Sequence, residues 1–160
     1  MQSTNVSLPE TQTAFVTGGA SGIGLATVEV LAQSGFHVVA IDRNAASVHQ
    51  MVERLTARQL SVEGAVADVC DRPVINRILD AQSRVDVMVC AAGIYKARFF
   101  DDITDEDFQR TLEVNLLGVF VAAQEASRRM SAGGRIVTVS SRGALGGAEG
   151  LRTTSPPRGE

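Results

Sequence analysis

Short apolar runs and helical patterns alternate along most of the chain. Runs rich in β-branched residues, such as Val38–Ile41, are typical of strands buried on both faces of a sheet. Between these runs, apolar residues recur every three or four positions, as in helices that cover a sheet. The pattern predicts strands near Thr13–Thr17, His37–Asp42, Val62–Ala67, Val85–Cys90 and Arg135–Ser140, and helices near Gly22–Gln33, Ala45–Arg58, Arg72–Gln82 and Asp105–Met130.

Regular alternation of strand and helix predicts an α/β fold with a doubly wound parallel sheet, because right-handed crossovers place helices on both faces. Residues 1–12 are polar, include Pro9 and lack periodicity, so we expect a disordered tail there. We expect residues 13–150 to form one domain and residues 151–160 to form a second tail, in which Pro156 and Pro157 oppose a helix.

Two predicted helices carry apolar stripes that we expect to face the sheet. A capping residue, Thr104 or Asp105, precedes the longer helix. Asn115 lies within its stripe and must find hydrogen-bond partners there, because an unpaired buried amide destabilises a fold. The stripe of the first helix is Ile23, Ala26, Val30 and Leu31, and that of the longer helix is Phe108, Leu112, Asn115, Leu116, Val119 and Phe120.

Composition narrows the class of protein. A net charge of -3 and 44% hydrophobic residues favour a soluble globular domain and oppose a basic nucleic-acid binder. No apolar run approaches the ~20 residues that a membrane span requires. Cys70 and Cys90 have no metal-ligand spacing, and residues 1–12 lack the pattern of a secretory leader. We therefore expect a cytoplasmic protein with reduced thiols, and an inert, packed Cys90.

Gly18, Gly22 and Gly24 fall between a predicted strand and a predicted helix, at the spacing G-x-x-x-G-x-G. Small residues there let the backbone turn sharply and approach a pyrophosphate, whose charge is met by N–H groups at the helix N-terminus. Such glycines can also serve only to relieve backbone strain. The flanking strand and helix, and Asp42 eighteen residues after Gly24, favour a dinucleotide site.

Asp42 ends the second predicted strand and bears on the choice of cofactor. Its carboxylate can accept hydrogen bonds from a ribose diol but would repel a 2′-phosphate, which favours NAD over NADP. The alternative is a helix-capping or turn aspartate. Arg43 makes the preference for NAD over NADP less certain from the sequence, because an arginine at that position could offset the charge of a 2′-phosphate.

The run from Thr17 to Gly24 resembles the T-G-x-x-x-G-I-G fingerprint of the short-chain dehydrogenases/reductases, and the resemblance extends from about Thr11 to Gly150. It implies a Rossmann-like fold, here incomplete at its C-terminal side. It also implies hydride transfer between NAD and a small alcohol or carbonyl substrate. The cofactor-binding residues that it implies are Gly18, Ser21, Gly22, Ile23, Gly24, Asp42, Asp68, Val69, Ala91, Ala92 and Gly93.

Two further motifs carry the resemblance beyond the glycine turn. Asp68-Val69 matches a position beside the adenine ring, although Asp68 could equally be a loop or capping residue ahead of the next helix. The run from Cys90 to Gly93 resembles the family's N-N-A-G motif, with Cys90 in place of the first asparagine. The side-chain amide contacts of that asparagine are therefore missing.

The resemblance also implies two catalytic residues. Asn115 matches the helix asparagine that holds a water in the proton relay; the alternative is an amide that only braces the helix. Ser141 follows an apolar strand that we expect to be buried, and it matches the serine that hydrogen-bonds the substrate oxygen. Without the resemblance, a serine at a strand end more often caps or turns the chain.

The family's Y-x-x-x-K pair is absent from this sequence. The single tyrosine and the single lysine are adjacent, at Tyr95 and Lys96, and so cannot lie one helical turn apart. Tyr95 is interpreted as a loop or pocket-wall residue. Because a positioned proton-transfer group contributes about 10²–10⁴-fold to rate, we expect this chain to be inactive or nearly so.

A shifted reading frame is one hypothesis for the missing pair. If Thr153–Arg158 were encoded ACT ACG TCG CCT CCA AGG, a shift of two bases would give Tyr-Val-Ala-Ser-Lys at the expected place. Sequencing the coding DNA tests this hypothesis.

The competing class is a non-catalytic fragment that binds a dinucleotide or self-associates. Without the family's remaining elements, the outer edge of the last strand and the outer face of the long helix would be uncovered, and such edges invite pairing. The resemblance implies that full-length relatives form homo-oligomers, in which the corresponding helix takes part together with a helix that is absent from this sequence. A methyltransferase is disfavoured because Asn115 and Ser140-Ser141 would have no role, and we expect neither nucleic acid nor membrane as a partner.

Overall fold

The computed structural model describes residues 11–96 and 98–141. The expected tail at 151–160, and the first ten residues of the expected N-terminal tail, lie outside the described residues. The helices and strands are β1 (Thr13–Thr17), α1 (Gly22–Gln33), β2 (His37–Asp42), α2 (Ala45–Thr56), β3 (Val62–Val66), α3 (Arg72–Asp80), β4 (Val85–Cys90), a 3₁₀ turn (Phe100–Asp102), α4 (Asp105–Leu112), a π-helical segment (Glu113–Leu117), α5 (Gly118–Ser127) and β5 (Met130–Thr138).

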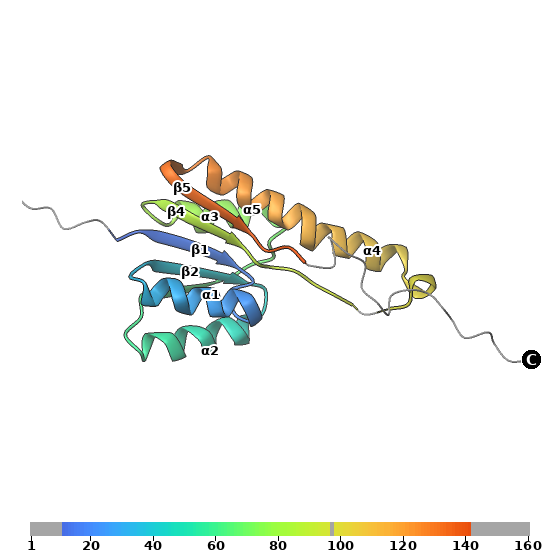
Figure 1. The fold of residues 1–160 in the computed structure, drawn as a ribbon, viewed down its shortest axis with the longest axis horizontal. Helices are drawn as coiled ribbons and strands as arrows, with labels where there is room; N and C mark the ends of the chain where they lie inside the picture. Colours follow the sequence, from blue (N-terminus) through green and yellow to red (C-terminus); the bar gives the residue numbers. More distant parts are fainter. Residues whose placement is uncertain (1–10, 97, 142–160) are drawn as a thin grey trace, which may run out of the picture.

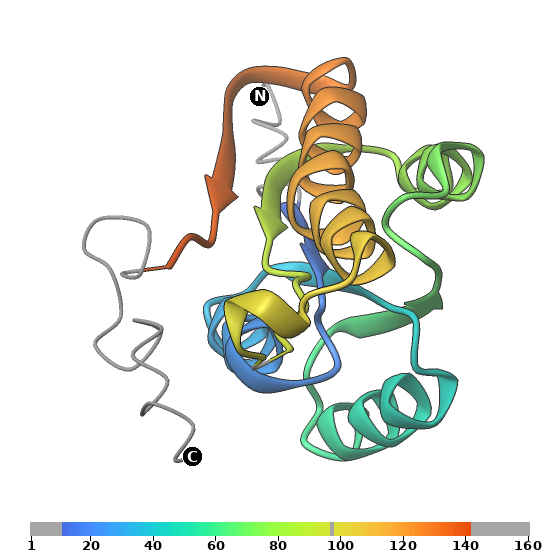
Figure 2. The same ribbon diagram turned by 90° about the vertical axis from the view of Figure 1, so that its right-hand side faces the viewer.

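The described strands form one parallel sheet with the order β3-β2-β1-β4-β5 (Figure 1). Helices α1 and α2 lie on one face, and α3 and α5 lie on the other (Figure 2). The order reverses between β1 and β4, where the chain crosses from one half of the sheet to the other. This arrangement confirms the predicted doubly wound, Rossmann-like fold.

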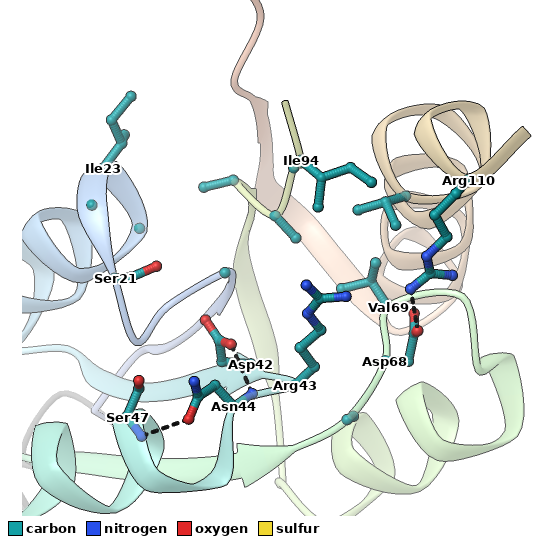
Figure 3. A pocket seen from close by; sticks show the side chains of 18 residues that line it. Ser21, Ile23, Asp42, Arg43, Asn44, Ser47, Asp68, Val69, Ile94 and Arg110 are labelled. Atoms are coloured by element: carbon teal, nitrogen blue, oxygen red, sulfur yellow. Dashed lines mark hydrogen bonds and ion pairs between the residues drawn. The ribbon is translucent and has the colours of Figure 1, made fainter. Parts of the chain in front are cut away.

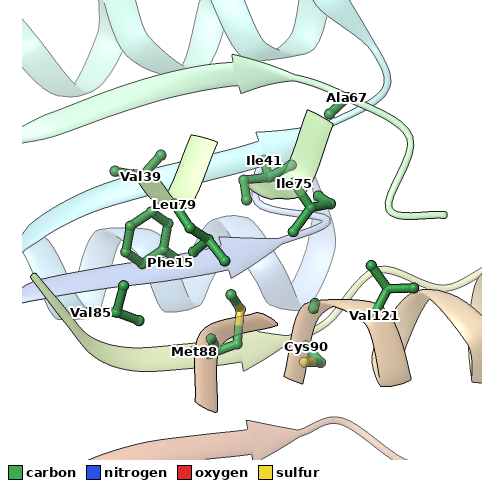
Figure 4. Packing of buried hydrophobic residues seen from close by; sticks show 12 residues of the cluster. Phe15, Val39, Ile41, Ala67, Ile75, Leu79, Val85, Met88, Cys90 and Val121 are labelled. Atoms are coloured by element: carbon green, nitrogen blue, oxygen red, sulfur yellow. The ribbon is translucent and has the colours of Figure 1, made fainter. Parts of the chain in front are cut away.

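Burial on both faces explains the nearly continuous apolar strands. Alternate side chains of β1 and β2 point to opposite sides, so Phe15, Val39 and Ile41 pack beneath α3 and α5 (Figure 4). On that side they meet Ile75 and Leu79 of α3, both almost fully buried. Their neighbours in the strands pack under the other helix pair, against Val28, Ala32, Met51 and Leu55.

The C-terminal third departs most from the sequence prediction. The helix expected over Asp105–Met130 contains a π-helical segment and ends at Ser127, and β5 begins at Met130 rather than Arg135. Met130 pairs with Val85, and Arg135 pairs with Val87, so a bulge interrupts the ladder between these pairs. β3, α2 and α3 also end one or two residues earlier than predicted.

The predicted buried faces of two helices were largely wrong, because only Leu31 and Val119 of the predicted stripes are partly buried and packed against the core. Phe108, Leu112, Leu116 and Phe120 are 43–64% exposed, as are Ile23 and Val30 of α1, at 64% and 61%. The sheet-facing positions are instead occupied largely by small side chains, because these let a helix approach the sheet closely. In α1 they are Gly24, Val28 and Ala32, and after α4 they are Val114, Gly118, Val121, Ala122 and Ala126.

β5 is an edge strand, so the prediction of a buried strand was wrong. It pairs only with β4 among the described strands, and Ile136 and Val137 are 40% and 50% exposed. Among residues 11–96 and 98–141, no strand pairs with the outer edge of β5. Among the described residues, no helix has the length and apolar character of a membrane span.

Candidate functional site

A cavity of about 460 Å³ opens at the carboxyl ends of β1, β2 and β4, where the strand order reverses (Figure 3). It brings together all eleven residues assigned to the cofactor from the sequence, whereas Asn115 and Ser141 are not among its lining residues. The lining residues are Gly18, Ser21, Gly22, Ile23, Gly24, Asp42, Arg43, Asn44, Ser47, Ala67, Asp68, Val69, Ala91, Ala92, Gly93, Ile94, Arg110 and Val114.

Two glycines of the turn after β1 are required by close backbone contacts. A Cβ at Gly24 would lie 2.1 Å from the carbonyl oxygen of Gly18, so no larger residue fits where α1 begins. Gly18 has a φ of +67°, and a Cβ there would lie 2.8 Å from the Cα of Ala92. The turn therefore passes directly against the segment that follows β4.

Thr17 joins the ends of β1 and β4 at the same point. Its hydroxyl oxygen accepts hydrogen bonds from the backbone N–H groups of Ala91 and Ala92, each at 3.2 Å. This contact fixes the segment after β4 beside the glycine turn. The segment begins next to Cys90, which stands where the family has asparagine.

The N-terminus of α1 lines the cavity with backbone N–H groups that have no hydrogen-bond partner within the described part of the chain. Ser21 is the N-cap, its side chain makes no capping bond, and the first helical bond runs from Leu25 N–H to the Ser21 carbonyl at 3.0 Å. The N–H groups of Gly22, Ile23 and Gly24 therefore precede the hydrogen-bonded turns of the helix. Together with the helix dipole, such donors favour an anion.

Asp42 stands at the end of β2, on the cavity wall. One carboxylate oxygen accepts from Asn44 N–H at 3.0 Å and the other from Ala20 N–H at 3.3 Å, so the side chain is oriented from both sides. The cap of α2 is Asn44 rather than Asp42, since its side chain accepts from Ser47 N–H at 3.0 Å. Asp42 thus serves as a turn aspartate while it also faces the cavity.

Asp68 lies at another part of the cavity wall, in the loop after β3. One oxygen accepts from Cys70 N–H at 2.9 Å, and the other accepts from the Arg110 guanidinium of α4 at 2.8 Å (Figure 3). The Cys70 N–H bond and the Arg110 bond hold the pKa of Asp68 below its usual value. The cap of α3 is Asp71, so Asp68 does not cap that helix.

Asn115, in the π-helical segment, is bonded to the loop after β4. Its amide oxygen accepts from Ile94 N–H at 2.8 Å, and its amide nitrogen donates to the Ile94 carbonyl at 2.9 Å. Single π-turns inside helices are frequent at functional sites. These bonds tie Asn115 to the loop beside the cavity residues Gly93 and Ile94. Asn115 is exposed, so its predicted place on a buried stripe was wrong.

The remaining singled-out residues lie outside the cavity lining. Ser141 is exposed beyond the carboxyl end of β5, and Tyr95 is 76% exposed in the loop after β4. Lys96 pairs with Asp107 at 2.8 Å. Cys90 is buried, which raises the pKa of its thiol to about 11 and agrees with the predicted inert cysteine.

Sequence reasoning missed several lining residues, above all Arg110. Its helix was predicted, but no motif marks an arginine on a charged helix as part of a site. Only the packing of α4 beside the β3 loop brings Arg110 to Asp68. Asn44, Ser47, Ala67, Ile94 and Val114 were also missed, since each belongs to an element whose neighbours in space were unknown.

Comparisons with known proteins agree with this geometry. A family model described as short chain dehydrogenase matches residues 12–152. The chain is 36% identical over 141 residues to the 2,3-dihydro-2,3-dihydroxybenzoate dehydrogenase of Bacillus subtilis (strain 168), covering 84% of this chain and 54% of the relative. It is 35% identical to the (2S)-[(R)-hydroxy(phenyl)methyl]succinyl-CoA dehydrogenase subunit BbsD of Thauera aromatica, covering 87% and 58%.

Solved structures show the same similarity. A short chain dehydrogenase from Burkholderia cenocepacia J2315, solved in complex with NADP, superposes with a TM-score of 0.80 at 34% identity and covers 86% of this chain and 58% of that chain. The chain therefore spans little more than half the length of these relatives. Motif, fold and matched length agree, and this chain belongs to the short-chain dehydrogenase family.

Proposed function

We propose that the cavity binds NAD, as part of an oxidoreductase that transfers a hydride between NAD and an alcohol or carbonyl substrate. The observation that best supports this proposal is that one cavity brings together the glycine turn after β1, the N–H groups at the start of α1 and the oriented carboxylate of Asp42. Gly22, Ile23 and Gly24 would hold the pyrophosphate, and Asp42 the adenosine ribose. When bound, NAD supplies the carbon that accepts or donates the hydride.

NAD is favoured over NADP at Asp42. Both oxygens of its carboxylate already accept backbone N–H groups, so the charge cannot easily turn away from a 2′-phosphate. Arg43 also lines the cavity and could attract that phosphate. We expect the fixed charge of Asp42 to outweigh the flexible side chain of Arg43, because a flexible side chain loses conformational entropy when it is ordered.

The proposed catalytic roles follow the family pattern. Ser141 would hydrogen-bond the substrate oxygen and stabilise the charge that develops on it. Asn115 would hold a water of the proton relay. Since its amide is already bonded to both backbone groups of Ile94, it would also fix the loop that carries Gly93 beside the cofactor.

The 160 residues contain no Y-x-x-x-K pair, and we therefore expect this chain to bind NADH without turnover. Calorimetric titration with NADH and NADPH measures the first part, and a spectrophotometric assay with NAD over a panel of secondary alcohols measures the second. Absence of NADH binding would refute the proposed site. Robust turnover would refute the proposed inactivity.

A second candidate is a non-catalytic dinucleotide-binding fragment that self-associates. The exposed apolar residues of α4 and the uncovered edge of β5 favour it. We further propose a cytoplasmic location, with which the free thiols of Cys70 and Cys90 agree. Fractionation of cells that express the chain tests the location.

A further inference from the structure

The cavity is chemically different along its length (Figure 3). At one end are the N–H donors of α1, and Asp42 follows on the wall; both suit the phosphates and sugar of a dinucleotide. The far end is formed by the loop after β3, by α4 and by the π-helical segment, and there the lining consists of Ala67, Asp68, Val69, Arg110 and Val114. A dinucleotide held at the first two points would place its base at this end, because the base follows the ribose.

Among the described residues, the only acidic side chain that lines this far end is Asp68, and it is held from two elements. Cys70 N–H fixes one oxygen at 2.9 Å, and the Arg110 guanidinium fixes the other at 2.8 Å. Each carboxylate oxygen can accept a second hydrogen bond. Arg110 is itself held by Glu113, at 3.1 Å, so its guanidinium has a defined position on α4.

We propose that Arg110 is a positioning residue that makes the site select adenine, by holding the Asp68 carboxylate as an oriented acceptor for an amino group on the base. This inference rests on the proposed function, since it requires that a dinucleotide binds in the cavity. An ionised carboxylate only accepts hydrogen bonds. It therefore favours the 6-amino group of adenine and repels the 6-oxo group of hypoxanthine.

The test compares reduced NAD with reduced nicotinamide hypoxanthine dinucleotide, which differ only in the base. Calorimetric titration gives both dissociation constants for the wild type, Arg110→Met and Arg110→Lys. The matched control is Arg54→Met. Arg54 lies on the surface of α2, away from the cavity lining, and pairs with Glu29 of α1. Thermal unfolding by circular dichroism establishes that each variant is folded.

The wild type is expected to bind the adenine dinucleotide more tightly. Arg110→Met is expected to bind the adenine dinucleotide roughly three- to tenfold more weakly and the hypoxanthine dinucleotide almost as well as the wild type does. The expected effect is modest because the Asp68–Arg110 pair is partly exposed. The preference between the bases then falls by the same factor. Arg110→Lys is expected to restore part of the preference, and Arg54→Met to leave it unchanged.

Two results would overturn the inference while leaving the proposed function intact. An equal loss for both dinucleotides in Arg110→Met would mean that Arg110 contacts the ligand by charge or stacking rather than through Asp68. An unchanged preference would mean that the Asp68–Arg110 pair is only structural. Failure of the wild type to bind either dinucleotide would instead overturn the proposed function, and this inference with it.

Discussion

Single residues in this site act through their backbone as much as through their side chains. Gly18 and Gly24 serve by lacking a Cβ, because each would otherwise meet backbone atoms at 2.8 Å or less. Asp42 and Asp68 serve as carboxylates, and each is held by two hydrogen bonds. Substitution of the glycines is therefore expected to affect folding as well as cofactor binding, whereas substitution of the carboxylates is expected to affect mainly cofactor binding.

Asp42→Asn is expected to change cofactor preference. The amide keeps the size of the side chain but removes the charge, so NADH should bind about tenfold more weakly, whereas NADPH should lose no affinity. Calorimetry with both cofactors measures the ratio. The control is Asp71→Asn, at the cap of α3 outside the cavity lining, where the ratio should not move. An unchanged ratio in Asp42→Asn would contradict the ribose contact.

Cys90 should make stability fall at alkaline pH. Burial raises the pKa of its thiol to about 11 in the folded chain, against an ordinary value of 9.0, so the unfolded chain ionises first. The contribution of the neutral Cys90 thiol to the free energy of unfolding is complete below about pH 9 and is lost as the pH rises towards about 11. Urea unfolding at about pH 8 and about pH 10.5, for wild type and Cys90→Ala, measures it; the variant should show the smaller decrease.

Thiol titration gives a second measurement on the same residue. A disulfide reagent at about pH 8 should leave buried Cys90 unmodified until the chain unfolds, because the thiolate is the reactive form. Cys70→Ser should therefore abolish most native-state reactivity, since Cys70 is partly exposed. Rapid labelling of Cys90 in the folded chain would contradict the packing seen in Figure 4.

At the scale of elements, the site depends on how closely α1 follows β1. The glycine turn and the bonds from Ala91 and Ala92 to Thr17 bring the ends of β1 and β4 to the start of α1. The π-helical segment after α4 serves the opposite wall, since it carries both Val114 of the cavity and Asn115. Two element junctions therefore form the two sides of the cavity.

Gly24→Ala should disturb the first junction. The added methyl group would lie 2.1 Å from the Gly18 carbonyl oxygen, so the start of α1 must move. We expect a loss of about 1–3 kcal/mol of stability and roughly a tenfold or greater loss of NADH affinity. Thermal unfolding and calorimetry measure the two effects. Gly35→Asn, beyond the other end of α1, is the control for affinity: its φ of +91° strains any side chain, so some stability is lost, but NADH affinity should not change.

At the scale of the whole molecule, the outer surfaces of the last elements matter most. Phe108, Leu112, Leu116 and Phe120 follow one another at steps of four residues and are all exposed. The elements that carry them, from α4 to α5, lie on the same half of the molecule as β5 (Figure 1). Exposed apolar stripes of this kind favour association.

Leu116→Glu should reduce that association without unfolding the chain. The side chain is 64% exposed, so stability should change by no more than about 0.5 kcal/mol, while light scattering should show a smaller species. Gln109→Glu adds the same charge to α4 outside the stripe and should have no such effect. Val121→Glu, at a position only 2% exposed, should unfold the chain. A wild type that is already monomeric would contradict the prediction.

The strands, most helices and the family could be predicted from the sequence because their signals are local. Strand–turn–helix spacing around Gly18–Gly24 is one such signal, and the apolar run Val38–Ile41 is another. The faces of the long helix could not be predicted, because hydrophobicity alone ranks Phe108 above Ala122. Close packing reverses that rank: near a sheet, small side chains allow the helix to approach.

The sequence by itself determined the order of strands and helices, the glycine turn and the acidic residue at the end of β2, since each depends on neighbours along the chain. Only the tertiary structure decided that Arg110 meets Asp68, that Thr17 binds the segment after β4, and that Asn115 binds the Ile94 peptide. These contacts join residues 21 to 74 positions apart. No local pattern specifies them, because they arise only when the crossovers bring separate elements to one edge of the sheet.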